Sequence, residues 1–148
     1  MGTLFDARDR AQVLERIGAL QPDRRPVWGR FAPAEMVCHV SASLRQALGE
    51  YEAAQGRGAL STWPLNWLAI HVAPWPKGKT QSPPEFLAVK PTTWEEDLAR
   101  LSALVGRFGD RKPEEAWPVS PFFGRISGRS WGVLQYRHLD HHLTQFGA

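Results

Sequence analysis

The sequence predicts an all-α protein that folds as a four-helix bundle with a long connection rich in proline and tryptophan. Four segments carry apolar residues at the three- and four-residue spacing of an amphipathic helix, and no segment shows the strict alternation of a half-buried strand. Two long Pro-rich connections separate the last three of these segments. Amphipathic helices joined partly by long crossovers are typical of a helix bundle.

Length and composition predict a single domain over residues 1–148. The chain has 148 residues, of which 43% are hydrophobic, and this is enough for one buried core. Its only cysteine, Cys38, cannot form an internal disulfide, and charged residues within positions 1–20 interrupt the apolar region that a secretory signal needs. We therefore expect a cytoplasmic protein.

Charge and hydropathy argue against nucleic acid or a membrane as a partner. The formal net charge is only +3, and the basic residues are scattered over separate loops rather than gathered on one helix face. The longest apolar stretch, residues 65–75, is interrupted by a histidine and a proline, and it is much shorter than the roughly 20 residues of a membrane span. We expect neither partner.

The first two helices have recognisable starts. Residues 6–20 predict the first helix, because Asp6 is suited to cap it and apolar residues follow at helical spacing. Prolines and a glycine then break the pattern. The second helix is expected to begin at Pro33 or Ala34, since proline suits a first turn, and to continue to the glycines within residues 56–58.

The crossover over residues 59–91 differs in kind from the helical segments. Its "PLNWLAI" portion predicts a short helix. The portion "APWPKGKTQSPPEF" contains too many prolines for regular structure, so it is expected to cross the surface as an ordered loop with aromatic anchors.

The last two long helices complete the predicted bundle. Residues 93–108 predict the third, because they begin with a Thr-x-x-Glu capping box and carry an apolar stripe that ends before a glycine. The final helix is expected to start at Ser127 or Ser130, either of which can cap it, and to run to Phe146.

Three of the five histidines lie within residues 138–142, near the end of the last helix. On a helical projection His138 and His142 fall one turn apart in the core-facing stripe, and His141 falls at its border. An unpaired polar ring in the interior costs about 1–3 kcal/mol, so these imidazoles need hydrogen-bond partners or a cation. The i, i+4 spacing lets both rings bind one metal ion, although a hydrogen-bonded core pair is the alternative. Leu139 stands where a His-Glu-x-x-His protease has its general base, which disfavours protease chemistry.

A third ligand must come from another part of the chain, and His39 on the second helix is the best candidate. It lies beside the core stripe in a polar row with Glu35, Ser43 and Gln46. Spacing alone leaves open whether this row lines a cavity between two helices or forms the solvated border of one helix. His71, which follows the short helix, is expected to have a capping or surface role.

These residues resemble a known family. The "HLDHH" of the last helix, the "PAEMVCHV" after a Trp-Gly-x-Phe segment and the crossover "APWPKGKTQSPPE" are similar in order and placement to the DinB-like (YfiT-like) superfamily of metal-binding four-helix bundles, and are closest to a branch of unknown function. The resemblance covers nearly the whole chain. It implies an up-down-down-up bundle in which His39, His138 and His142 hold a divalent metal, often nickel or zinc, and His141 is a neighbour rather than a ligand.

The resemblance also implies a class of reaction. Relatives are described as thiol S-transferases, in which a low-molecular-weight thiol attacks a small electrophile, and they are commonly homodimers. Three neutral imidazoles leave the +2 charge of an ion uncompensated, so a thiol or water at its open position is acidified near neutral pH. The alternatives are a protein that binds metal or a small molecule without turnover, and a structural bundle without metal.

Further residues are candidates for the surroundings of the predicted site. Glu35, one turn before His39, and Gln135, one turn before His138, are placed to fix the tautomer of a ligand imidazole, although ordinary polar helix positions are the alternative. Trp67 and Trp75 of the crossover are candidates to wall a metal cavity, or simply to seal one end of the bundle.

Overall fold

The computed structural model describes residues 1–78 and 82–148, which form helices and no strand, so the all-α prediction is confirmed. The four long helices are α1 (Ala7–Gly18), α2 (Pro33–Ala47), α5 (Trp94–Asp110) and α6 (Gly128–Gln145). The short elements are the 3-10 turn η1 (Ala59–Ser61) and the helices α3 (Leu65–His71) and α4 (Pro84–Leu87).

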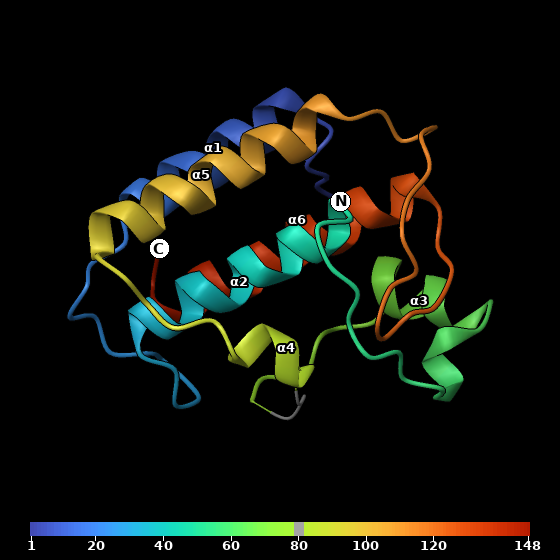
Figure 1. Ribbon diagram of the computed structural model, residues 1–148, viewed down its shortest axis with the longest axis horizontal. Helices are drawn as coiled ribbons and strands as arrows, with labels where there is room; N and C mark the ends of the chain where they lie inside the picture. The colour runs from blue at the N-terminus through green and yellow to red at the C-terminus, as the bar shows by residue number, and fades with distance from the viewer. Residues whose placement is uncertain (79–81) are drawn as a thin grey trace.

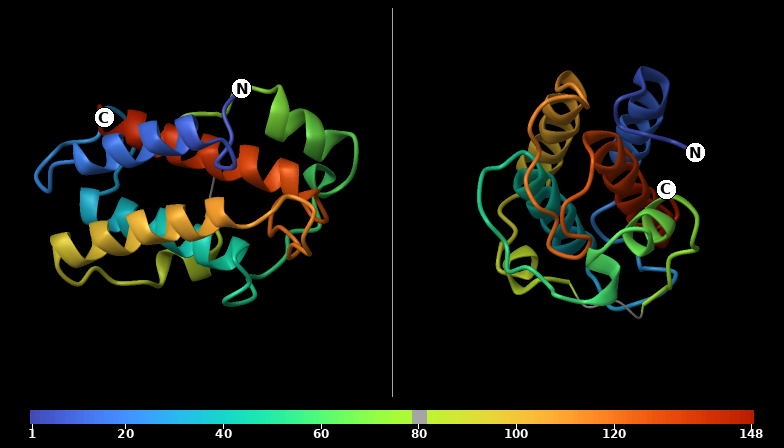
Figure 2. Two further views of the ribbon diagram at one scale, coloured as in Figure 1. Left: turned by 90° about the horizontal axis from the view of Figure 1, so that it is seen from above. Right: turned by 90° about the vertical axis from the view of Figure 1, so that its right-hand side faces the viewer.

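Each long helix packs against two of the others. Helices α1 and α2 both contact α5, and both also contact α6. Figure 1 shows α1 beside α5 and α2 beside α6, and the end view in Figure 2 shows the four helices around a common interior. Helix α3 packs against α6 and α4 against α2, so the crossover covers the side of the molecule formed by these two long helices (Figure 1). The part of the predicted crossover at residues 79–81 lies outside the described residues.

The interior is built from the apolar stripes that the sequence predicts. On α2, Met36, Val40 and Leu44 are each at most 1% exposed, and on α6 Trp131 and Leu139 are equally buried. Burying one such side chain stabilises the fold by roughly 1.5–3 kcal/mol. The same core contains apolar residues of the other two long helices: Val13, Ile17, Leu101, Leu104, Val105 and Phe108.

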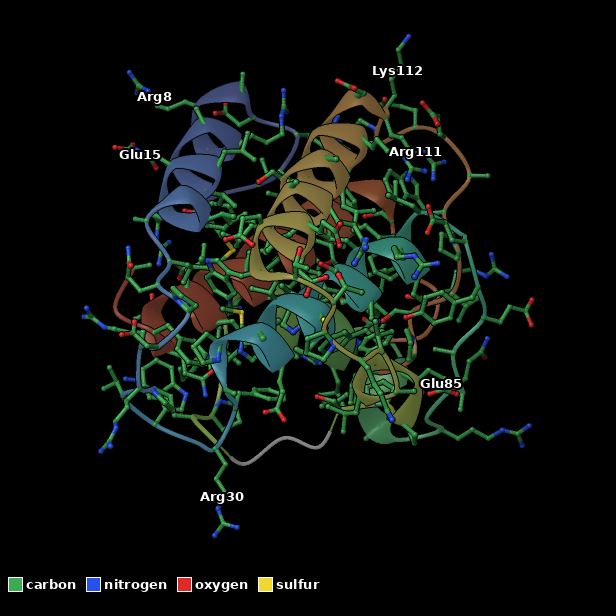
Figure 3. The ribbon with its side chains drawn as sticks, turned by 60° about the vertical axis from the view of Figure 1, so that its left-hand side comes forward. Arg8, Glu15, Arg30, Glu85, Arg111 and Lys112 are labelled. Carbon is green, nitrogen blue, oxygen red and sulfur yellow. The ribbon has the colours of Figure 1, made fainter. Side chains whose placement is uncertain are left out.

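Charged side chains project from the outside of the molecule. In Figure 3 the labelled side chains of Arg8, Glu15, Arg30 and Lys112 extend away from the helices toward solvent. Within the described ranges, none of the helices combines the length and the apolar character that crossing a bilayer would require.

The helix starts follow the predicted capping residues. The Asp6 carboxylate accepts the backbone N–H groups of Arg8 and Asp9, and the Ser127 hydroxyl accepts that of Ser130 at 3.1 Å. The Thr93 hydroxyl does the same for α5. Each cap satisfies backbone donors that the first helical turn leaves unpaired, and this contributes about 1 kcal/mol.

The end of α2 corrects the predicted boundary. The helix stops at Ala47, well before the glycines within residues 56–58. Gly49 adopts a φ of 80°, a left-handed conformation that favours glycine, and the backbone N–H of Glu50 donates to the carbonyl of Arg45 at 3.0 Å. This pattern is a Schellman cap, so Gly49 ends the helix.

A second correction concerns the Pro-rich part of the crossover. Residues 84–87 were expected in an irregular loop, yet they form the single helical turn α4. Pro84 occupies its first turn, where a missing backbone N–H costs nothing. The turn buries Phe86, which is 6% exposed, against α2.

Candidate metal centre

Three histidines from two helices converge inside the molecule. His39 of α2 and His138 and His142 of α6 each offer one nitrogen, and these atoms all lie within 4.8 Å of one another. The Nε2 atoms of His39 and His138 are 2.9 Å apart, and the ring centroids of each pair are 4.9 Å apart. His39 and His142 are buried, whereas His138 is partly accessible because its ring faces a cavity.

The packing of α2 against α6 explains the convergence. His138 and His142 lie one turn apart and face α2, where His39 is 3% exposed. Ser43 and Gln46, which follow His39 along α2, also line the cavity. The polar row therefore faces a cavity, and this decides between the two interpretations that the spacing left open.

Glu35 is the exception in this row. Its side chain is exposed, and Oε2 accepts a hydrogen bond from the backbone N–H of Ala32 at 2.9 Å. This bond satisfies a free donor at the start of α2. The contact that Glu35 makes is thus a helix cap, which agrees with the alternative of an ordinary polar helix position.

The interior keeps all three imidazoles neutral at neutral pH. Burial, with a smaller effect from the neighbouring imidazoles, lowers the pKa of His39 to about 3, and burial lowers the pKa of His142 to about 4. Burial, followed by the effects of His39 and His142, also holds the pKa of His138 well below its ordinary value. A neutral imidazole has a free lone pair, which is the form that binds a metal ion.

The donor set fits a divalent cation. Nδ1 of His39 is buried without a hydrogen-bond partner among the described residues, and its Nε2 has only the ring of His138. An ion bound between the two Nε2 atoms would replace the contact between these rings, whereas Nδ1 of His39 would stay without a partner. Two nitrogens held by one ion at 2.0–2.1 Å would lie about 3 Å apart, close to the observed separation. The group could therefore hold a metal ion.

Gln145 is a site residue that the sequence analysis missed. Its Oε1 accepts a hydrogen bond from Nδ1–H of His142 at 2.8 Å, and its Nε2 donates to the backbone carbonyl of Trp28 at 2.7 Å. The second bond fixes the orientation of the amide, so that its oxygen faces His142 and holds the ring proton on Nδ1. The lone pair is then on Nε2. The i, i+3 spacing of His142 and Gln145 on one helix is the signal that could have found it.

Aromatic rings from the α1–α2 connection and from α4 lie beside the cluster. The ring of Phe31 lies 5.3 Å from His39 and 5.7 Å from His142, and the ring of Phe86 lies 6.0 Å from His39. His141 contacts Trp28, with centroids 5.4 Å apart, and lies outside the group of potential ligands. It is a neighbour of the cluster, as the resemblance implied.

The histidine cluster opens onto a cavity of about 760 Å³, a volume within the range of sites for small molecules. Ser43 and Gln135 form part of its polar surface. Gln135 was a candidate to orient a ligand imidazole, with an ordinary polar position as the alternative, and its hydrogen bonds join Ser43 at 3.2 and 3.3 Å.

One of the two predicted tryptophans walls this cavity. Trp75 lines it, and its Nε1 donates to the carbonyl of Ala69 at 3.0 Å. The Arg137 guanidinium stacks on Trp75 at 5.1 Å and donates to the carbonyls of Ile70 and Ala73 at 2.6 Å each, which ties the end of α3 to α6.

Trp67 is not among the described residues that line the cavity, which leaves the second of its two predicted roles, sealing one end of the bundle. Trp67 is 46% exposed, and its ring stacks on His71 with centroids 5.1 Å apart. Its position on α3 turns it away from the wall that Ala69 and Trp75 form. His71 contacts the Ser130 hydroxyl at 3.0 Å and is not part of the histidine cluster.

The chain matches no protein-family model, no curated protein and no solved structure. A functional assignment must therefore rest on the geometry of the residues of this chain.

Proposed function

We propose that this protein is a DinB-like metal-binding protein whose long helices form an up-down-down-up bundle. His39, His138 and His142 hold one divalent ion, nickel or zinc, between α2 and α6. The observation that carries the proposal is the convergence of three neutral imidazoles from two helices beside a cavity large enough for a small molecule.

We propose thiol transfer as the class of reaction. An ion held by the three histidines would supply Lewis acidity to a thiol, and this would favour release of the thiol proton to solvent near neutral pH. The thiol sulfur forms a bond to an electrophilic carbon, whose leaving group takes the bonding electron pair. The residues of the chain would hold the reactants in the cavity, with Phe31 and Phe86 beside the histidines.

A protein that binds metal or a small molecule without turnover is the second candidate. Among the described residues that line the cavity there is no carboxylate, lysine, tyrosine or cysteine. Proton transfer at the reacting atoms would therefore depend on histidine or on solvent. This composition favours binding over a reaction that needs a separate general acid.

A bundle without metal is the third candidate. The separation of 2.9 Å between Nε2 of His39 and Nε2 of His138 also fits a hydrogen bond between the two rings. Metal analysis of tag-free protein after incubation with nickel or zinc separates this candidate from the others. We expect about one equivalent of metal in the wild type and less than about a tenth in His142→Ala.

The matched control is His141→Ala, which removes the adjacent ring and leaves the cluster intact. Equal metal contents in the wild type and His142→Ala would contradict the assigned ligands. Turnover of a chromogenic electrophile with a thiol then distinguishes transfer from binding. Activity that survives complete removal of the metal would exclude the proposed metal-dependent reaction.

A further inference from the structure

We infer that the cavity binds an uncharged, largely apolar molecule with an amide or hydroxyl group that contacts Ser43 and Gln135, one helical turn from the metal centre. This inference rests on the proposed function, since it names the class of molecule that the same site takes. It assigns Ser43 and Gln135 as a polar subsite distinct from the histidines.

Ser43 and Gln135 have hydrogen-bonding capacity that the protein leaves unused. Gln135 is 1% exposed, and both of its side-chain hydrogen bonds in the described structure go to the Ser43 hydroxyl. A glutamine amide offers two N–H donors and two acceptor lone pairs, so one hydroxyl partner cannot satisfy it. Each of these side-chain atoms already has one partner, and a ligand amide or hydroxyl can use the donor and acceptor capacity that remains.

The positions of these two residues set the spacing of the ligand groups. Ser43 follows His39 by four residues on α2, and Gln135 precedes His138 by three residues on α6. One helical turn rises about 5.4 Å, so the polar pair lies about that far from the histidines along the α2–α6 interface. A ligand that spans both would carry a metal-binding atom and a polar group separated by a short linker.

The remaining wall is suited to apolar groups. Phe31, Trp75, Phe86, Phe123 and Leu134 all line the cavity. The ligand therefore gains mostly by removing apolar surface from water, and the polar pair fixes its orientation.

Charge argues against an anionic ligand. Arg30 is the only lining residue in the described part of the chain with a permanent charge, and Figure 3 shows its side chain extending toward solvent. Lys77, nearby, is exposed and holds its ammonium 4.6 Å from the centroid of the Trp28 ring. The proposed ion would compensate one thiolate, but the carboxylates of a thiol such as glutathione would lose hydration without a buried lysine or arginine beside them among the described lining residues.

Three thiols test the inference by isothermal titration calorimetry. N-benzyl-3-sulfanylpropanamide is uncharged and carries an amide, 5-phenylpentane-1-thiol matches its length without the amide, and glutathione is anionic. We expect the amide thiol to bind the wild type at least tenfold more tightly than glutathione. The variant Ser43→Ala/Gln135→Leu should lose about tenfold affinity for the amide thiol and none for the phenylpentane thiol, since a lost hydrogen bond of about 1.4 kcal/mol is a factor of ten.

Ser41→Ala is the matched control, because Ser41 is a buried serine on the same helix that does not line this cavity. If the double variant does not fold, Ser43→Ala alone replaces it. The inference is overturned if glutathione binds as tightly as the amide thiol, or if the variant loses less than about threefold in affinity for the amide thiol.

Metal content is measured on the same samples, and the titrations are repeated on metal-free protein with N-benzylbutanamide, which needs no metal. Absence of metal from the wild-type protein would refute the proposed function but not the polar subsite. Weaker binding of N-benzylbutanamide to the Ser43→Ala/Gln135→Leu variant than to the wild type would still support the polar subsite. Equal binding to both proteins would overturn it.

Discussion

Gln145 determines which nitrogen of His142 can act as a ligand. Its amide is held at both ends, by Nδ1–H of His142 and by the carbonyl of Trp28, so the lone pair of the imidazole lies on Nε2. Residues that orient a ligand in this way typically contribute 10- to 100-fold to metal affinity. We expect Gln145→Leu to weaken nickel and zinc binding by about this factor, measured by competition with a chromophoric chelator.

Gln46→Leu is the control for this prediction. Gln46 is also a buried glutamine, but its amide donates to the carbonyl of Val119 and makes no hydrogen bond to the cluster in the described structure. Its loss should leave metal affinity within about threefold of the wild type. Unchanged affinity in Gln145→Leu would mean that His142 keeps its tautomer without the amide.

The three histidines differ in how far the sequence could predict them. His138 and His142 share one helix face, so periodicity alone placed them inward. His39 lies at the edge of the apolar stripe on α2. Whether its side chain faces a cavity or solvent depends on which helix packs against that edge, so spacing alone leaves both alternatives open. Phe31 belongs to a segment without helical periodicity, and only the fold brings its ring to His39.

At the scale of the element, Gly132 shows why the effect of glycine in a helix depends on its neighbours. A Cβ at Gly132 of α6 would lie 2.5 Å from the Phe5 ring and the Thr3 hydroxyl, whereas a Cβ at Gly106 of α5 would have no such neighbour within 4 Å. Alanine normally stabilises a helix interior by about 0.5–1 kcal/mol relative to glycine. We expect this gain in the free energy of unfolding for Gly106→Ala.

For Gly132→Ala we expect the opposite sign. The backbone N–H of Leu4 donates to the Gly132 carbonyl at 3.2 Å, so the N-terminal segment cannot move away without losing this bond and the burial of Leu4. Overpacking of this kind costs about 1–3 kcal/mol, and urea denaturation measures it. Stabilisation of both variants would show that the N-terminal segment adjusts freely.

The helix boundaries that the sequence predicted correctly are those set by local chemistry. Asp6 and Ser127 cap helices through bonds to residues two or three positions away, so their effect does not depend on the rest of the fold. The end of α2 was placed too late because Gly49 was not recognised as a cap. Helix α4 was missed because one turn is too short for periodicity, and it is fixed by burial of Phe86.

At the scale of the whole molecule, the cavity is the feature that sequence could least predict. Its lining comes from α2, α6 and the connecting segments, including residues as distant in sequence as Trp28 and Phe123. Amphipathic periodicity shows which face of each helix is buried, but it does not show where packing leaves space. The candidate ligands were thus predictable one helix at a time, whereas the space beside them required the tertiary structure.

Because the candidate ligands come from two helices, metal binding should stabilise the folded protein as a whole. The unfolded chain separates His39 from His138 by about a hundred positions, so an ion binds the folded state far better. At a free metal concentration of 100 times Kd, the gain is about 2.7 kcal/mol. For a chain of this length, each kcal/mol raises Tm by roughly 2–4 °C. Differential scanning fluorimetry of tag-free protein should therefore show an increase of roughly 5–10 °C with saturating nickel or zinc.

Two histidine variants show whether this increase arises at the cluster. His39→Ala removes the only ligand that α2 contributes to the described group, so the metal-dependent increase in Tm should disappear. His71→Ala removes a ring that contacts Ser130 and lies outside the group, so the increase should persist. An increase that survives in His39→Ala would place the stabilising metal elsewhere on the protein. A metal site formed by α6 alone would not hold two helices together. Metal binding there would therefore not stabilise the packing of α2 against α6.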